Sequence, residues 1–221
     1  MKTVLFIGPS GSGKDTQSNI LVEKYPREFE QITTGDVLRI MHQLRITEGE
    51  EAYSYLVKGK WVPNRLMYRL LSKWLHLFGE NESWLLIGAV REEEQVDMLD
   101  EVLKEHNRKL DKVIHFTLDA ETVVERLKNR KSCPLCGKIY HSVYNPEKEE
   151  GKCDDDGNNL IVREDDNPAA IRVRLQEYER TIKPILEKYN ERGILVNIDA
   201  SRRIEEINEE VEKVLDIKGK R

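Results

Sequence analysis

The stretch that most constrains the fold lies at residues 4–16 and reads VLFIGPSGSGKDT. Its four apolar residues predict a buried strand, and the glycine-rich turn after them leads into a helix near Lys14. Glycines let backbone N–H groups surround a chain of phosphates, and a helix N-terminus adds partial positive charge. Lys14 would reach the terminal phosphates, and Thr16 would offer a hydroxyl to the magnesium ion that neutralises them. A glycine-rich loop alone could be an ordinary turn, but strand, spacing and helix together predict phosphate binding.

Length and composition exclude several classes of protein. The chain has 221 residues, enough for one domain with insertions or at most two domains. Charged residues make up 35% of it, yet the formal net charge is only −5, which argues against general binding to nucleic acid. No apolar run reaches membrane-spanning length, and the N-terminus lacks a signal-peptide pattern, so we expect a soluble, cytoplasmic protein without a membrane partner. No heptad or extended apolar stripe stands out, so we expect a monomer.

Strand-like and helix-like segments alternate along most of the chain. After the first strand, apolar runs predict strands at residues 31–33, 84–90, 113–118 and 194–198. The segments between them carry apolar residues at helical spacing, and Asp119 and Asn167 are expected to be helix N-caps. Five strands alternating with helices predict a doubly wound α/β core. Ligands of such cores gather at the carboxyl ends of the strands, where Arg91 lies, whereas His115 lies mid-strand and is expected to be a packed core residue.

Residues 129–166 break this alternation and contain the three cysteines. Cys133 and Cys136 form one C-x-x-C knuckle, and Cys153 begins a second in which Asp156 stands at the place of the fourth cysteine. A carboxylate oxygen is an acceptable zinc ligand, so the pattern predicts a Cys3Asp site for a structural zinc ion. With four protein ligands the site would be closed, and the zinc would stabilise the segment without performing chemistry. A redox C-x-x-C pair and free thiols without metal are the alternatives.

Six arginines lie near loops, strand ends or the boundaries of this insertion, namely Arg39, Arg91, Arg126, Arg130, Arg163 and Arg174. A single surface arginine is usually solvated. Guanidinium groups that converge on the first loop would instead stabilise the charge that spreads over a transferred phosphoryl group. Such an enzyme must also exclude water, and a movable, metal-stabilised insertion would serve as its lid.

Taken together, these motifs resemble the adenylate kinase family in its long-lid, zinc-bearing form. The resemblance covers nearly the whole chain and rests on GPSGSGKDTQ at 8–17, TGDVLR at 34–39, GKWVP at 59–63, RLKNR at 126–130, the cysteine knuckles with Tyr140 and His141, and REDD at 163–166 with Arg174 and Leu175. It implies a P-loop NTPase-type fold, a doubly wound five-stranded parallel sheet with two inserted mobile subdomains. The core would comprise residues 1–32, 63–128 and 167–221, with an AMP-binding subdomain at 33–62 and a zinc-binding lid at 129–166.

The resemblance also implies a role for each matching residue. ATP would be bound by Gly8, Ser10, Gly11, Ser12, Gly13, Lys14, Asp15, Thr16, Arg126, Arg130 and Tyr140. AMP would be bound by Thr34, Gly35, Arg39, Lys60, Trp61, Val62, Gly88, Arg91, Gln95, Arg163 and Arg174. Lys14 and the six arginines would be the catalytic residues, and Asp165 and Asp166 would form a hinge of the lid. Magnesium would accompany ATP.

One departure from the family pattern bears on this magnesium. The family usually has Asp-Gly-Phe-Pro-Arg at the end of the third strand, where this chain has IGAVR at 87–91. The missing acid helps to orient the water shell of magnesium in the family, and Ile87 cannot do this. Asp36 or the carboxylates of 92–94 could compensate, or Ile87 simply extends a buried strand. Without the Phe-Pro pair, the turn before Arg91 is also expected to be less fixed.

A second departure is Asp15, which stands where the family often has glycine and where the common phosphate-loop pattern has Ser or Thr. We expect it to point outward from the first turn of the helix, where the helix dipole favours an acid. The alternative is that it disfavours an anionic ligand.

Three functions are compatible with these patterns. The leading one is an adenylate kinase that converts ATP and AMP into two ADP with magnesium. The second is a nucleoside monophosphate kinase with another acceptor base, because one changed pocket contact could alter the acceptor. The third is a nucleotide-binding protein that catalyses poorly. Ile87 supports it, whereas Lys14 and the six arginines argue against it, since mere binding does not require a transition-state clamp.

Overall fold

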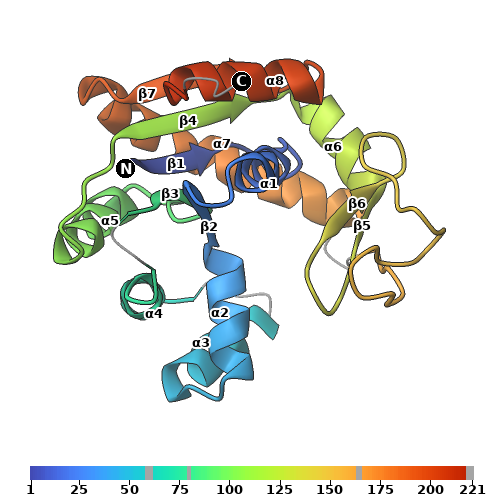
Figure 1. The fold of residues 1–221 in the computed structure, drawn as a ribbon, viewed down its shortest axis with the longest axis horizontal. Coiled ribbons are helices and arrows are strands. Elements are labelled where there is room, and N and C mark those ends of the chain that lie inside the picture. Colours follow the sequence, from blue (N-terminus) through green and yellow to red (C-terminus); the bar gives the residue numbers. More distant parts are fainter. Residues whose placement is uncertain (58–61, 79–80, 163–165, 218–221) are drawn as a thin grey trace.

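The apolar run near the N-terminus forms the central strand of a five-stranded parallel sheet (Figure 1). The computed structural model describes residues 1–57, 62–78, 81–162 and 166–217. The strand order is β2-β3-β1-β4-β7, with bounds β1 (Thr3–Ile7), β2 (Phe29–Thr33), β3 (Ser83–Ile87), β4 (Lys112–Thr117) and β7 (Leu195–Asp199). All five residues of β1 are buried, as expected for a strand covered on both faces.

Helices pack on the sheet, while a pair of helices and an insertion with two short strands project from it. The helices are α1 (Lys14–Lys24), α2 (Thr34–Gln43), α3 (Thr47–Val57), α4 (Asn64–Leu75), α5 (Glu94–Glu105), α6 (Ala120–Lys128), α7 (Pro168–Glu191) and α8 (Ile204–Val214). β5 (Arg130–Ser132) and β6 (Ile139–His141) form a separate antiparallel pair. In Figure 1, α2 and α3 project below the sheet, and the insertion that contains β5 and β6 projects to the right. Among the described residues, we find no helix whose length and apolarity would suffice to span a bilayer.

Alternate residues of β1 point to opposite faces of the sheet, as an extended chain dictates. Leu5 and Ile7 join an apolar cluster with residues of α4, α5 and α7. Val4 and Phe6 join a second cluster with residues of α1 and α8. Because each face of the parallel sheet is covered by helices, the predicted doubly wound α/β fold is confirmed.

Several element ends follow from single residues. The Asp119 carboxylate accepts a hydrogen bond from Thr122 N at 2.8 Å, and Asp119 caps α6 as predicted. β3 ends at Ile87 and not at Val90, because Gly88 has a φ of 71° and turns the chain away from the sheet. The apolar residues after Gly88 are still buried, which explains why the sequence pattern extended the strand too far.

His115 is a packed residue of β4, as predicted. Its ring nitrogens lie 2.8 Å from Asn197 Oδ1 and 2.7 Å from Tyr178 Oη, so both are satisfied within the core. Burial lowers the pKa of His115.

Candidate active site

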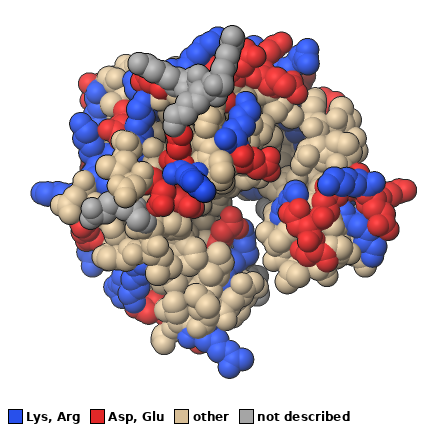
Figure 2. Space-filling model, viewed as in Figure 1, with Lys and Arg blue, Asp and Glu red and all other residues tan. Residues whose placement is uncertain are grey.

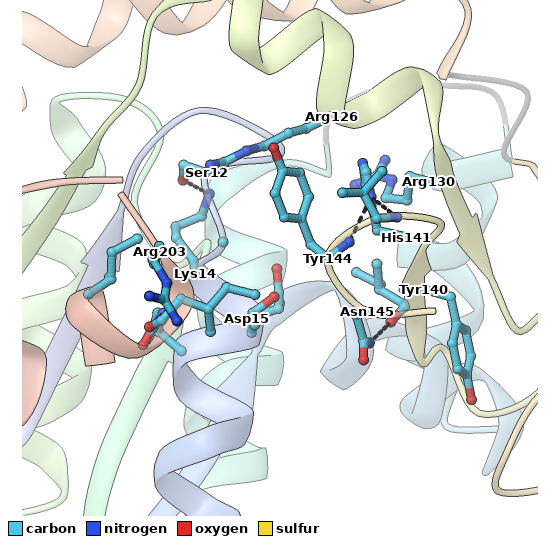
Figure 3. Close-up of a pocket in the computed structure, with 18 of the residues that line it drawn as sticks. Ser12, Lys14, Asp15, Arg126, Arg130, Tyr140, His141, Tyr144, Asn145 and Arg203 are labelled. Carbon is cyan, nitrogen blue, oxygen red and sulfur yellow. Dashed lines mark hydrogen bonds between the residues drawn. The ribbon is translucent and has the colours of Figure 1, made fainter. Parts of the chain in front are cut away.

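A cavity of about 380 Å³ opens between the glycine-rich loop, the end of α6 and the β5–β6 insertion (Figure 3). Its lining residues are 11–17, Arg126, Leu127, Arg130, Ile139, Tyr140, His141, Val143, Tyr144, Asn145, 202–205 and Ile207. On the face seen in Figure 2, a hollow separates this insertion from the body of the molecule. The cavity therefore has one wall on the loops and helices around the sheet and another on a projecting unit.

The glycine-rich loop takes a shape that its glycines permit. A side chain at Gly8 would place its Cβ 2.7 Å from the carbonyl oxygen of Phe116, which is too close for any real Cβ. Gly13, the N-cap of α1, has a φ of 85°, in the left-handed region that glycine adopts at little cost. Residues 11–16 line the cavity, whereas Gly8 and Ser10 belong to the same loop but not to the lining.

Lys14 is held by the loop that precedes it. Its Nζ donates hydrogen bonds to the carbonyl oxygens of Gly8 and Pro9, both at 2.8 Å, and to Ser12 Oγ at 3.3 Å. Burial lowers the pKa of Lys14 to about 8. The loop thus fixes a cation at the wall of the cavity before any ligand is present.

Three charged residues act on Lys14. The negative charge of Asp15 raises its pKa and opposes burial, while the positive charges of Arg91 and Arg130 lower it further. Asp15 also lines the cavity (Figure 3). The expectation that Asp15 points away from the site was therefore wrong, because the first turn of α1 faces the insertion across the cavity.

Arg126 reaches the cavity from α6. Its guanidinium donates a hydrogen bond to the carbonyl oxygen of Ala200 at 3.0 Å and lies 5.2 Å from the centroid of the Tyr144 ring. The contact joins the core of the molecule to the insertion, since Tyr144 follows β6. Arg126 thus lies between the segment after β7 and the projecting unit.

Arg130 and Arg174 share one buried carboxylate. Arg130 donates two hydrogen bonds to Asp166, at 2.7 and 2.6 Å, and Arg174 donates one at 2.9 Å. Desolvation of the fully buried Asp166 side chain would raise its pKa, but the two arginines outweigh this and hold the pKa below its usual value. Arg130 lines the cavity and Arg174 does not.

A second group of predicted residues lies around the start of α2. The Thr34 hydroxyl donates a hydrogen bond to the carbonyl oxygen of Gly88 at 3.0 Å. Arg39 forms an ion pair with Asp36, and its guanidinium covers Gly35, where a Cβ would lie 3.4 Å from Nη1. The Asp36 carboxylate is therefore engaged by Arg39, which weakens the expectation that it compensates for Ile87.

Arg91 lies at the carboxyl end of the sheet, after β3. A Cβ at Gly88 would lie 3.3 Å from its Nη2, so the guanidinium folds back over this glycine. Gln95 is buried, and its Oε1 accepts a hydrogen bond from Arg91 N at 2.6 Å. Val62 is buried in the main core cluster. Lys60, Trp61, Arg163 and Asp165 lie outside the described residues.

The cysteine knuckles come together as predicted. One ligand atom each from Cys133, Cys136, Cys153 and Asp156 lies within 4.8 Å of the others. Three thiols and a carboxylate are a donor set that suits zinc, and the group can hold a metal ion. The Tyr140 hydroxyl donates to Cys153 Sγ at 3.4 Å, and Figure 3 shows its ring directed away from the cavity centre. Tyr140 thus lines the cavity while its polar end belongs to the cysteine group.

Comparison with known proteins identifies the family. A profile described as adenylate kinase matches residues 6–194. The chain belongs to the adenylate kinase family. The adenylate kinase of Chloroherpeton thalassium is 38% identical to it over 216 residues, 97% of this chain and 98% of the relative. That of Archaeoglobus fulgidus is 36% identical over 213 residues, covering 96% and 97%, and that of Staphylococcus epidermidis is 37% identical over 213 residues, covering 96% and 98%. The predicted resemblance is confirmed.

Ile87 is an unusual residue for the adenylate kinase pattern described above, and the structure shows its surroundings. Its side chain is 2% exposed, pairs in register with Phe6 and belongs to the apolar cluster beneath α1 and α8. The interpretation that it extends a buried strand is confirmed. Ile87 therefore contributes to the core and cannot hold water or metal.

Some cavity residues of this adenylate kinase family member were not predicted as site residues from the sequence. They are His141, Val143, Tyr144, Asn145, Arg202, Arg203, Ile204 and Glu205. The segment 202–205 follows β7, so the rule that ligands gather at the carboxyl ends of parallel strands could have identified it. Val143 is 71% exposed and Tyr144 48% exposed, and such exposed apolar side chains beside a cavity have no signature in sequence periodicity.

Proposed function

We propose that this chain catalyses the reversible, magnesium-dependent transfer of a phosphoryl group from ATP to AMP, giving two ADP. The supporting observation is that Lys14, Arg126 and Arg130 line one cavity between a glycine-rich loop and a projecting insertion. Phosphoryl transfer needs little covalent chemistry from the protein, only positioning and charge stabilisation, and a cluster of cations supplies both. Membership of the adenylate kinase family points to the same reaction.

In this proposal no side chain acts as a covalent nucleophile. An oxygen of the AMP phosphate attacks the γ-phosphorus of ATP, and the bond to the β–γ bridging oxygen breaks. Lys14 and residues 8–16 hold the ATP phosphates, with Arg126 and Arg130 across the cavity. Thr34 and Gln95 contact the adenine of AMP, and Arg39 and Arg91 hold its phosphate. Arg163 and Arg174 complete the phosphate clamp.

Magnesium is the cofactor implied by this reaction. Asp15 and Thr16 both line the cavity, and carboxylate and hydroxyl oxygens suit Mg²⁺. Bound with ATP, the ion would neutralise phosphate charge during transfer. Ile87 offers no oxygen donor, so any carboxylate contribution comes from elsewhere in the chain.

The chain divides, in this proposal, into a core and two moving parts. Residues 1–32, 63–128 and 167–221 form the core, residues 33–62 bind AMP, and residues 129–166 close over the cavity as a lid. Closure excludes water, which would otherwise hydrolyse ATP. Zinc in the Cys133, Cys136, Cys153 and Asp156 group stabilises the lid. We further propose a cytoplasmic monomer whose partners are ATP, AMP and ADP, without nucleic acid or membrane partners.

The acceptor is tested by measuring ADP formation from ATP with AMP, CMP, UMP and GMP in parallel. We expect kcat/KM for AMP to exceed that for each other acceptor by about 100-fold or more, since missing base contacts are costly in a built pocket. A higher kcat/KM with CMP, UMP or GMP than with AMP would assign another acceptor and leave the mechanism in place. Equal values for all four would contradict selection for AMP.

A further inference from the structure

The turn between β3 and α5 is held by a buried tyrosine. The Tyr68 hydroxyl of α4 has one proton, which it shares between two carbonyl oxygens, that of Ala89 and, at 3.0 Å, that of Gln95. Tyr68 is 3% exposed, and Ala89 and Val90 are buried as well. Burial raises the pKa of Tyr68, so the hydroxyl keeps its proton and remains a donor at neutral pH. Hydrogen bonds thus hold the turn before Arg91, where the family pattern has a proline.

A chain of amide groups holds the same turn from its other side. Gln95 Oε1 accepts hydrogen bonds from Arg91 N at 2.6 Å and Glu92 N at 3.2 Å, and Gln95 Nε2 donates to Asn64 Oδ1 at 2.6 Å. Asn64 Nδ2 donates in turn to the carboxylates of Glu92, at 3.1 Å, and Glu94. Carboxylates only accept, so the orientation of both amides is determined.

These contacts converge on the backbone of Arg91. Asn64 and Tyr68 are four residues apart in α4 and therefore lie on one helix face, which meets the turn. A phenylalanine at 68 would fill almost the same volume without the cost of burying a hydroxyl. The hydroxyl therefore serves to hydrogen-bond the backbone of the turn rather than to add apolar burial. Its two acceptors, Ala89 and Gln95, lie on either side of Arg91 in the sequence.

We propose that Tyr68 is a positioning residue that sets the location of Arg91 and hence the affinity of the enzyme for the phosphate of the acceptor nucleotide. This rests on the proposed function, in which Arg91 binds that phosphate. Asn64 supports the same turn through Gln95. Neither Tyr68 nor Asn64 lines the cavity proposed to bind ATP. In this proposal each acts through the turn that carries Arg91.

The test compares Tyr68→Phe with Tyr189→Phe. Tyr189 is also fully buried, but its hydroxyl has no hydrogen-bond partner among the described residues, so it controls for loss of a buried hydroxyl as such. We expect Tyr68→Phe to raise KM for AMP about three- to tenfold, the size of effect that one lost hydrogen bond produces, with KM for ATP unchanged within about twofold. Tyr189→Phe should leave both KM values unchanged. Asn64→Ala should also raise KM for AMP, as Tyr68→Phe does.

Two results would overturn the proposal. One is an unchanged KM for AMP in Tyr68→Phe together with a lower melting temperature, which would make the hydroxyl purely structural. The other is an equal rise of both KM values, which would indicate general loosening. Calorimetric titration of AMP in the absence of ATP separates this proposal from the proposed function. It measures the affinity of Tyr68→Phe and Tyr189→Phe for AMP, and it does so even if the wild-type protein transfers no phosphoryl group.

Discussion

Lys14 shows how a loop prepares a cation for phosphate. Three hydrogen bonds to its own loop hold the ammonium group, and burial lowers its pKa to about 8 from an ordinary value of 10.5. The folded-state pKa lies below the unfolded one, so the charged form destabilises the empty protein below pH 8. Stability is therefore gained as the pH rises from about 8 to about 10.5.

This titration predicts how ATP binding depends on pH. As the pH rises above about 8, Lys14 in the empty site loses its proton, and the affinity for MgATP should fall by up to about tenfold per pH unit. Isothermal titration between pH 7 and 9.5 measures it. Lys14→Ala should bind MgATP weakly and without this pH dependence. A wild-type affinity that stays constant over the range would contradict the assigned role of Lys14.

Single residues also mark the limit of sequence-based prediction. The loop around Lys14 was predictable because its glycines, its lysine and the flanking strand are contiguous. The position of Asp15 at the cavity was not predictable from the sequence. It depends on where the insertion, more than 100 residues later in the chain, folds relative to α1. The buried surroundings of Ile87 followed correctly from the apolar run in which it lies.

At the scale of elements, the insertion around β5 and β6 has its own small core. Cys133, Tyr140 and Cys153 are buried together, with Leu160 packed beside them. A cluster of this size buries too little apolar surface to be stable alone, so a metal cross-link is the expected source of order. Its ligand spacing is local in sequence, which explains why the knuckles were predictable.

The metal is tested by elemental analysis of the purified protein. We expect about one zinc per chain, retained in the presence of a reducing agent, and a melting temperature lowered by about 5 °C or more after chelation. Cys136→Ser should lose the metal. Asp155→Asn should keep it, because that exposed carboxylate pairs with Lys138 and lies outside the ligand group. Metal-free protein with an oxidised Cys pair would support the redox alternative.

Apolar periodicity predicted the strands and helices and their order, but it did not always predict the residues at which they end. β3 stops at Ile87 because Gly88 adopts a left-handed conformation, which a count of apolar residues cannot reveal. Helix caps were more tractable, since Asp119 and Asn167 bind amides three residues onward. Hydrogen-bonded helix caps were therefore predictable, and the backbone conformation of a single glycine was not.

At the scale of the molecule, the site is built from long-range contacts. The cavity combines the start of α1, the end of α6, the insertion and the segment before α8. The contact of Tyr68 with Ala89 and the sharing of Asp166 by Arg130 and Arg174 likewise join separate elements. None of these pairs leaves a periodic pattern in the sequence, so the parts of the site could be predicted but not their mutual placement.

The central claim is that this chain, with Ile87 in its core, transfers a phosphoryl group from ATP to AMP with magnesium. The most direct test incubates γ-labelled ATP with AMP, with and without Mg²⁺, and follows the label. We predict label in the β-position of ADP at about 1 s⁻¹ or faster, only with Mg²⁺, and a loss of about 100-fold or more in Lys14→Ala. Label released as inorganic phosphate, or ATP bound without transfer, would contradict the account.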